Sequence, residues 1–131
     1  MTAEIEFQRA INTALTGAGL RVYDFAPQEG DGASPATYPY VEIGHIIAAQ
    51  WDTNTESGFD TVCRIHTFSR SGSTVECRTI QGQIYAALHK SALTITGFAP
   101  VFLDREMSDC TRQPDGSFHG VCEYRTLLET L

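Results

Sequence analysis

The sequence has 131 residues, of which 42% are hydrophobic and 19% charged, and its formal net charge at pH 7 is −7. This size and composition are typical of one globular domain with a modest core, so we expect a single domain over residues 1–131. The acidic balance argues against a nucleic-acid binder, because affinity for DNA comes mainly from Lys and Arg side chains that neutralise phosphates, and Lys90 is the one lysine in the sequence.

The sequence shows neither a membrane span nor a targeting signal. No apolar run approaches the roughly 18 residues that are needed to cross a bilayer. The acidic start, Met1–Glu6, lacks the basic region and apolar core of a signal peptide. We therefore expect no membrane contact, and synthesis and function in the cytoplasm.

The first predicted element is a helix that begins near Thr2. Thr2 is a good N-cap, and Glu4 and Glu6 in the first turn interact favourably with the helix dipole. Gly17 and Gly19 predict the end of this helix. Its apolar face repeats at helical spacing and consists of Phe7, Ala10, Ile11, Ala14 and Leu15.

Two weaker signals follow this helix. Residues 20–25 predict a short strand, whereas residues 27–39 contain the Gly, Pro, Asp and Ser that are typical of a loop. This loop has neither the ligand series of a calcium site nor the Gly-Lys-Ser/Thr of a phosphate loop. It therefore indicates no ligand.

The centre of the chain predicts two adjacent strands, at residues 38–47 and 59–69. Both are rich in β-branched residues, which favour a pleated, half-buried surface. The polar segment Gln50–Gly58 between them predicts the connection of an antiparallel hairpin. It is longer than most hairpin loops, and unusually long loops are often functional, so we expect it to project from the sheet.

The clearest helix signal begins at Ser73. Ser73 and Glu76 have the spacing of a capping box. The helix should run to about Lys90, whose charge suits the C-terminal end of the dipole. Its apolar face consists of Cys77, Ile80, Ile84, Ala87 and Leu88.

The rest of the chain predicts strands. Residues 93–95, 100–107 and 118–128 are strand candidates, and Pro114–Gly116 is a strong turn. Both faces of 118–128 mix polar and apolar residues, as expected for a sheet with helices on one side and a neighbouring subunit on the other. The predicted fold class is therefore α+β: an antiparallel β-sheet with two α-helices on one face and a long projecting hairpin loop.

The cysteines do not form a metal motif. Cys63, Cys77, Cys110 and Cys122 include no Cys-x-x-Cys pair, which most structural zinc sites need. We interpret them as small core residues. Cys110 and Cys122 flank the predicted turn almost symmetrically, so a disulfide between these two is the alternative.

The histidines do not form a catalytic or metal motif either. His45, His66, His89 and His119 lie far apart in the sequence, and the nucleophile elbow of serine hydrolases is missing. We predict no catalytic residue, no metal and no cofactor. A Cys-His dyad that forms only in space is the alternative.

One group of carboxylates allows two interpretations. Asp104, Glu106 and Asp109 lie near a predicted strand end. They form either a paired-carboxylate site or a charged strand edge that discourages pairing with other chains, and we favour the charged edge.

Trp51 is the strongest candidate for an interface residue. It is a lone tryptophan in a polar segment, so it either packs back onto the fold or is presented to a partner. Tryptophan is enriched in binding hot spots because it buries a large area at small entropic cost. The candidate interface residues are Trp51, Asp52, Thr53, Asn54, Thr55 and Glu56.

A series of short motifs extends along nearly the whole chain. They are Tyr38-Pro39-Tyr40-Val41, Trp51-Asp52-Thr53, Phe68-Ser69-Arg70, Ile84-Tyr85-Ala86-Ala87-Leu88-His89, Leu93-Thr94-Ile95, and Asp115-Gly116 before His119-Gly120-Val121. Each motif alone is unspecific. Together, in this order and spacing, they resemble a family of small phage tail-completion or tail terminator proteins.

The resemblance implies a structural protein of a phage, or of a tail-derived particle such as a gene transfer agent. Such proteins form a homo-oligomeric ring, usually hexameric, that caps the tail tube at full length. One ring face binds the tail tube protein, and the other presents a surface to the head–tail connector. The resemblance thus implies assembly in the host cytoplasm and a final place in the virion tail or neck.

DNA would pass through such a ring without specific binding. A lumen that is acidic or neutral would keep DNA off the wall, and Asp104, Glu106 and Asp109 are the candidates for it. Two alternative functions remain at this point. One is a neck protein of the head–tail connector, and the other is a small enzyme that uses a Cys-His or carboxylate pair.

Overall fold

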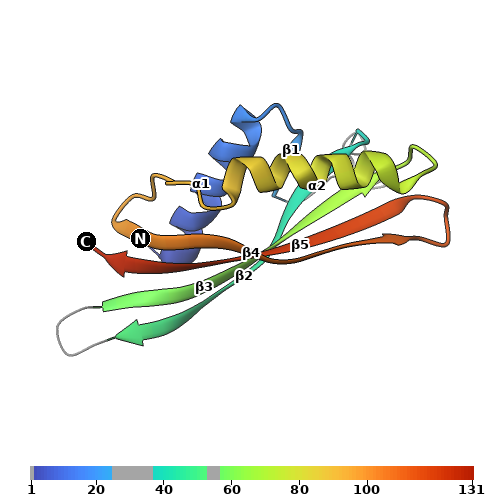
Figure 1. Cartoon of the computed structure of the whole chain (residues 1–131). Helices are drawn as coiled ribbons and strands as arrows, with labels where there is room; N and C mark the ends of the chain where they lie inside the picture. The colour runs from blue at the N-terminus through green and yellow to red at the C-terminus, as the bar shows by residue number, and fades with distance from the viewer. Residues whose placement is uncertain (1, 25–36, 53–56) are drawn as a thin grey trace, which may run out of the picture.

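The computed structural model describes residues 2–24, 37–52 and 57–131. The strands form one sheet in the order β1-β2-β3-β5-β4. Both helices lie on the same face of this sheet (Figure 1), which confirms the predicted α+β fold. The elements are α1 (Ala3–Gly17), β1 (Val22–Tyr23), β2 (Tyr40–Asp52), β3 (Ser57–Ser69), α2 (Thr74–Leu88), β4 (Phe98–Arg112) and β5 (Phe118–Thr130).

The sheet is antiparallel except at one edge. Neighbouring strands from β2 to β4 pair antiparallel, but β1 runs parallel to β2, with Val22 opposite Val41. The predicted antiparallel sheet is therefore confirmed from β2 to β4, whereas the two-residue strand β1 is parallel. The connection from Tyr23 to Tyr40 is long enough for the crossover that a parallel pair requires.

Every described residue of the predicted loop Gln50–Gly58, 50–52 and 57–58, belongs to a strand. Trp51 pairs with Gly58 and Asp52 with Ser57, so β2 and β3 continue into it. The predicted loop residues Thr53–Glu56 lie outside the described residues. Polar residues do not end a strand whose side chains face water on one side of the sheet, which is why the low hydrophobicity of this segment was misleading. The sheet end formed by this hairpin extends past both helices (Figure 1).

A second correction concerns residues 93–95, which are not a strand. Ile95 makes only an isolated bridge with Phe98, where β4 begins. Ile95 is nevertheless buried. The apolar pattern at 93–95 therefore reflects packing against the core rather than strand pairing.

Both predicted N-caps are present, but one capping box is not. The Oγ1 atom of Thr2 accepts a hydrogen bond from the Ile5 amide, and the Oγ atom of Ser73 accepts one from Val75. Glu76, the predicted partner of Ser73, instead accepts a hydrogen bond of 2.6 Å from the Ser69 hydroxyl. Glu76 therefore fixes the end of β3 to the start of α2.

The core lies between the helices and the sheet. Side chains alternate along each strand, so every second residue of β3 and β5 points toward α1 and α2. No helix in the described part of the chain is both long enough and apolar enough to span a bilayer. Fully buried core residues include Phe7, Ile11, Leu15, Cys63, Ile65, Ile84, Leu88, Cys122, Tyr124 and Leu128.

All four cysteines are free thiols, and three are buried. Cys110 and Cys122 do not oppose each other, because Cys110 pairs with Gly120 and Cys122 with Ser108. The Cys110 side chain instead contacts Cys77 on α2. The core interpretation is therefore correct for Cys63, Cys77 and Cys122, whereas the alternative disulfide is not formed.

Candidate protein interface

The sheet has one face that is accessible to solvent, and this face lies opposite the two helices. None of the described helices covers it (Figure 1). The side chains that point to it along β5, such as Val121, Glu123 and Arg125, are partly exposed, whereas their sequence neighbours Cys122 and Tyr124 are buried. We call this surface the open face.

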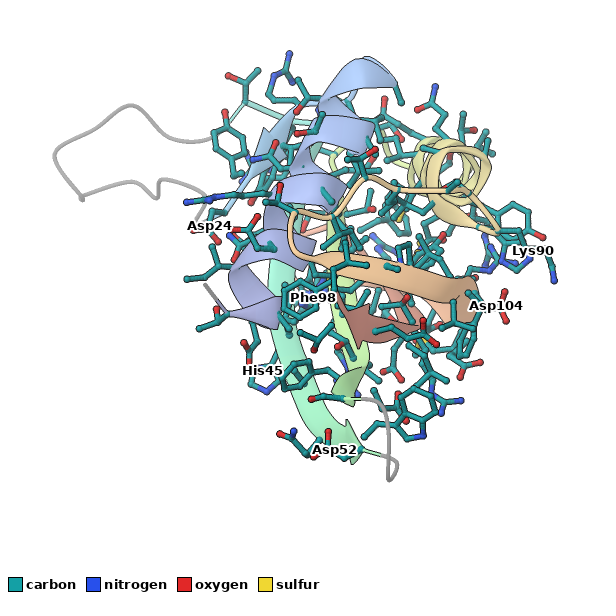
Figure 2. The ribbon with its side chains drawn as sticks, turned by 90° about the vertical axis from the view of Figure 1, so that its left-hand side faces the viewer. Asp24, His45, Asp52, Lys90, Phe98 and Asp104 are labelled. Atoms are coloured by element: carbon teal, nitrogen blue, oxygen red, sulfur yellow. The ribbon has the colours of Figure 1, made fainter. Side chains whose placement is uncertain are left out.

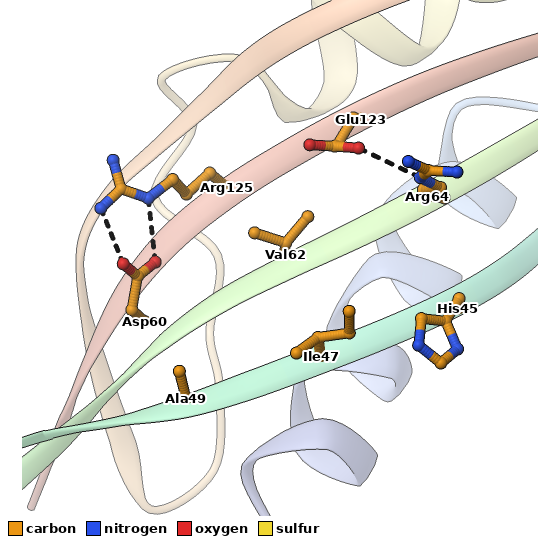
Figure 3. A pocket seen from close by; sticks show the side chains of 8 residues that line it. All are labelled: His45, Ile47, Ala49, Asp60, Val62, Arg64, Glu123 and Arg125. Carbon is orange, nitrogen blue, oxygen red and sulfur yellow. Dashed lines mark hydrogen bonds and ion pairs between the residues drawn. The ribbon is translucent and has the colours of Figure 1, made fainter.

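A groove of about 660 Å³ crosses the open face. Figure 3 shows Val62 of β3 between two pairs of charged side chains on β3 and β5, with Ile47 and Ala49 of β2 to one side of them. Ile47 is 54% exposed, and Ala49 is exposed as well. The groove is lined by His45, Ile47, Ala49, Asp60, Val62, Arg64, Glu123 and Arg125.

Two ion pairs hold the charged side of this groove. Arg125 donates two hydrogen bonds to Asp60, of 2.9 Å from Nε and 2.7 Å from Nη2, and Arg64 Nε donates to Glu123 at 3.1 Å (Figure 3). The bidentate bond from Arg125 holds the pKa of Asp60 below its usual value. Each pair joins β3 to β5, so the charges are arranged by the strand register before any partner binds.

A row of aromatic rings crosses the same face nearer the other end of the sheet. The Phe68 ring stacks on Tyr40 at 4.9 Å and on His119 at 4.7 Å between ring centroids. Tyr23 and Tyr38 pack edge-on against Tyr40. The row therefore continues from β1 to β5.

His66 and His119 form a pair within this row. Nδ1 of His66 lies 2.8 Å from Nε2 of His119. Burial lowers the pKa of both imidazoles, His119 lowers that of His66 further, and Glu42 opposes both shifts. A Cβ atom on Gly44 would lie 2.6 Å from the His66 ring, so glycine at this position makes room for the pair.

The predicted interface residues Trp51 and Asp52 lie at the hairpin end of the sheet. Trp51 is half-buried and lies beside Gly58, where an added Cβ atom would be 2.9 Å from the indole. Gln50 donates hydrogen bonds to Asp52, which lowers the pKa of that carboxyl group. The other predicted interface residues, Thr53, Asn54, Thr55 and Glu56, lie outside the described residues.

The predicted lumen residues lie on β4, the outer strand of the sheet (Figure 2 labels Asp104). Asp104 lies 3.9 Å from the ammonium group of Lys90. Glu106 occupies a bulge of β4, and Asp109 is exposed and accepts a hydrogen bond from the Cys110 amide. The three carboxylates are thus spread along one strand and do not form a paired site.

The arrangement offers little support for catalysis. Among the described residues, no group of three or more His, Cys, Asp or Glu side chains is placed to hold a metal ion. Burial raises the pKa of the Cys63 and Cys77 thiols to about 12, which keeps them protonated and poorly nucleophilic. Cys63 and His66 lie on opposite faces of β3, so they do not form a dyad.

Sequence reasoning missed the ion pairs and the histidine pair. Both depend on the register of β3 with β5, in which Val62 lies opposite Arg125 and His66 opposite Val121. The signal available in the sequence was the matching alternation of the two strands, but it does not give the offset between them.

Comparisons with known proteins give one family and one fold. The sequence profile described as "Tail completion protein gp17" matches residues 8–129. A chain from a solved structure described as the virion of a native gene transfer agent (GTA) particle is similar to this chain, with a TM-score of 0.82 and 18% sequence identity. The similarity covers 98% of this chain and 99% of that chain, and it shows a shared fold. No curated protein sequence matches.

Proposed function

The chain belongs to the tail completion protein gp17 family, and we propose that it closes the tail tube of a phage or phage-like particle as a ring that also joins the tail to the head. The observation that carries the proposal is the family match over residues 8–129. It identifies a structural tail protein. The capping role, the ring and the joining role are our proposal.

The open face supports a role in assembly rather than catalysis. A surface that combines exposed apolar side chains with preformed ion pairs is typical of protein interfaces, where partners need fixed polar contacts around an apolar centre. We propose no catalytic residue, metal or cofactor for this protein. Its proposed partners are further copies of itself in a ring of six, the tail tube protein and the head–tail connector, and it assembles in the host cytoplasm before it becomes part of the tail or neck.

The charge of the open face suits a DNA channel. Arg64 and Arg125 are both paired with carboxylates, and the exposed Glu106 and Asp109 add further negative charge at the outer strand. A wall of this kind does not hold phosphates firmly, because free cationic side chains are what bind DNA. We therefore propose that the part of the open face that partners leave uncovered faces the channel, with Asp104, Glu106 and Asp109 in or near the lumen.

The β2–β3 hairpin is the proposed contact with a neighbouring ring or subunit. Its end extends past the helices (Figure 1), and Trp51 supplies a large, partly exposed ring there. Burial of a tryptophan at an interface typically contributes about 2 kcal/mol or more per subunit. Repeated around a ring, such contacts give firm attachment through multivalency.

The test uses particles that carry altered chains. One variant replaces residues 53–56 by Asn-Gly, and a second carries Trp51→Ala. Both should fold, yet the shortened hairpin should give uncapped or overlong tails in electron micrographs. A matched control is Val75→Ala, which removes an exposed side chain from α2 and should leave tail length unchanged. Normal tails with the shortened hairpin would contradict the hairpin role, and one copy of the chain per tail would contradict the ring.

The second candidate function is a neck protein of the head–tail connector. The acidic charge and the open face of the chain are compatible with this function as well as with the first. The same micrographs separate the two, because loss of a neck protein leaves tails of normal length without heads, whereas loss of a terminator alters tail length.

A further inference from the structure

Two thiols lie next to each other where α2 packs on the β4–β5 hairpin. Cys110 on β4 lies opposite Gly120 on β5, and directly opposite residues of an antiparallel pair share one face of the sheet. That face is the covered one, because a Cβ atom added to Gly120 would lie 2.7 Å from Cys77 Sγ on α2. The Cys77 thiol therefore lies over the Gly120 position, and it is hydrogen-bonded to the Cys110 thiol.

Gly120 is the residue that allows this approach. A side chain at position 120 would fill the space next to Cys77 Sγ, and it would keep α2 further from the sheet. Cβ positions that oppose each other on paired strands are about 4.5–5.5 Å apart. Cys77 Sγ is thus close to the Cys110 side chain, and rotation of the two side chains brings the sulfurs within bonding distance.

The two thiols differ in their access to solvent. Cys110 is partly exposed, whereas Cys77 is fully buried. Burial raises the pKa of the Cys77 thiol to about 12, so this thiol reacts poorly with a dissolved oxidant. An oxidant therefore reaches Cys110 first, and Cys77 is the neighbour that completes a disulfide.

The other two cysteines are less well placed for this reaction. Cys63 and Cys122 are both fully buried. Cys122 pairs with Ser108 rather than with Cys110, and its thiol is hydrogen-bonded to Gln81, one helical turn after Cys77. The geometry therefore favours a bond between Cys77 and Cys110.

We infer that Cys77 and Cys110 form a disulfide once the chain leaves a reducing cytoplasm, and that this bond fastens α2 to the end of β4. Residues 89–97 join α2 to β4 at the opposite end of both elements, so the bond closes the end that the chain leaves open. Such a cross-link stabilises a fold mainly by restricting the unfolded chain. The timing rests on the proposed function, because a phage-like particle assembles in the cytoplasm and is then released into an oxidising medium.

The reaction needs an external oxidant, and a soluble disulfide such as oxidised glutathione is sufficient. The Cys110 thiolate attacks one sulfur of the oxidant, whose S–S bond breaks, and one glutathione leaves as a thiolate. Cys77 then loses its proton to water and attacks Cys110 Sγ, which releases the second glutathione. The protein loses two electrons and two protons, and the oxidant becomes two thiols. Because Cys110 Sγ is held beside Cys77, proximity offsets the small thiolate fraction of Cys77.

The test is a count of thiols on the purified full-length chain. The chain is treated with oxidised glutathione, unfolded in urea, alkylated with N-ethylmaleimide and weighed by mass spectrometry. Two of the four thiols should be protected from alkylation, and a digest should contain one linked peptide with Cys77 and Cys110. Alkylation of all four thiols would overturn the inference.

Three single variants identify the pair. Cys110→Ser should keep its remaining thiols free, because the other three cysteines are buried. Cys77→Ser should retain one glutathione on Cys110, since no neighbouring thiol displaces it. Cys122→Ser is the matched control and should still form the linked peptide. Loss of the link in Cys122→Ser, with the variant folded by circular dichroism, would assign the bond to a different pair and overturn the inference.

Unfolding in urea measures what the bond does for the fold. The oxidised chain should unfold at a higher urea concentration than the reduced chain, because the bond restricts the unfolded state. Cys110→Ser should show no difference between the two conditions. Equal midpoints for the oxidised and reduced original chain would overturn the fastening role.

Intact particles separate this inference from the proposed function. Thiols are trapped with N-ethylmaleimide before and after release from the host cells. The chain should carry free thiols inside the cells and the Cys77–Cys110 link in released particles. Free thiols in released particles would overturn the timing of the bond, whereas particles without the chain would contradict the proposed function and leave the chemistry of the purified chain as measured.

Discussion

The helix-covered face and the open face of the sheet are built from the same strands, yet they differ in burial and chemistry. On the covered face, Ile65 and Tyr124 are fully buried among apolar side chains. On the open face, Asp60 and Arg125 are 33% and 39% exposed and bond to each other. Strand alternation separates the two sets, so one segment of chain serves both the core and a surface.

This difference indicates that the covered face mainly stabilises the fold and that the open face mainly serves recognition. Apolar burial on the covered face provides most of the free energy of folding. The open face satisfies its charges internally, which reduces the reorganisation that binding needs. Substitutions should therefore affect stability on one face and assembly on the other.

The largest expected effect on stability comes from the covered face. Ile65→Ala should lower the free energy of unfolding by about 2–5 kcal/mol, because it removes buried methyl and methylene groups and leaves a cavity. Val62→Ala, three residues earlier on β3 and on the open face, should cost only about 1 kcal/mol. Chemical denaturation of both variants measures the difference, and equal losses would show that the open face is buried in the free chain.

Two glycines extend the comparison to backbone packing. An added Cβ at Gly120 would lie 2.5 Å from Gln81 Nε2 and 2.7 Å from Cys77 Sγ, beneath α2. Gly120→Ala should therefore cost about 1–3 kcal/mol through overpacking. Gly44→Ala should cost less, because its shortest contacts would be with the partly exposed His66 ring, with the Arg64 carbonyl oxygen further away at 3.0 Å. Thermal unfolding compares the two, and a larger loss at Gly44 would contradict the assignment of the faces.

The sequence predicted the covered face better than the open face. Helical spacing at Phe7, Ile11 and Leu15 and strand alternation around Ile65 depend on local apolar patterns, which is why both helices and the fold class were predicted correctly. The His66–His119 contact depends on the offset between β3 and β5, which local patterns do not contain.

The errors at the hairpin and at β1 have a similar cause. Trp51 and Asp52 belong to β2 because Gly58 and Ser57 pair with them, and no residue in the segment signals that pairing by itself. The parallel position of β1 likewise depends on contacts with Val41 and Glu42 that lie far along the chain.

The histidine pair gives a smaller effect that depends on pH. Burial lowers the pKa of His66 and His119 in the folded chain, so folding favours their neutral forms. The stability from these groups is full above the unfolded pKa of about 6.5 and is lost as the pH falls below it. The denaturation midpoint should drop between about pH 7 and pH 5, and His119→Gln should reduce this drop. An unchanged pH profile in the variant would show that other groups cause the dependence.

The smallest effect on stability is expected at the Asp60–Arg125 pair, and it is the sharpest test of the comparison. Arg125 lowers the pKa of Asp60 by hydrogen bonding and by its charge, so the pair stabilises the fold at neutral pH and loses this contribution as the pH falls through the lowered pKa. Asp60→Asn should change the unfolding midpoint only slightly at neutral pH, because exposed ion pairs contribute little. It should still impair incorporation into tails, since it breaks one of the preformed ion pairs that we propose as fixed polar contacts of the interface. Asp115→Asn, in a turn away from the groove, is the matched control and should not affect incorporation. If Asp60→Asn destabilised the chain as much as Ile65→Ala, the open face would be part of the core, and the division of roles between the two faces would be wrong.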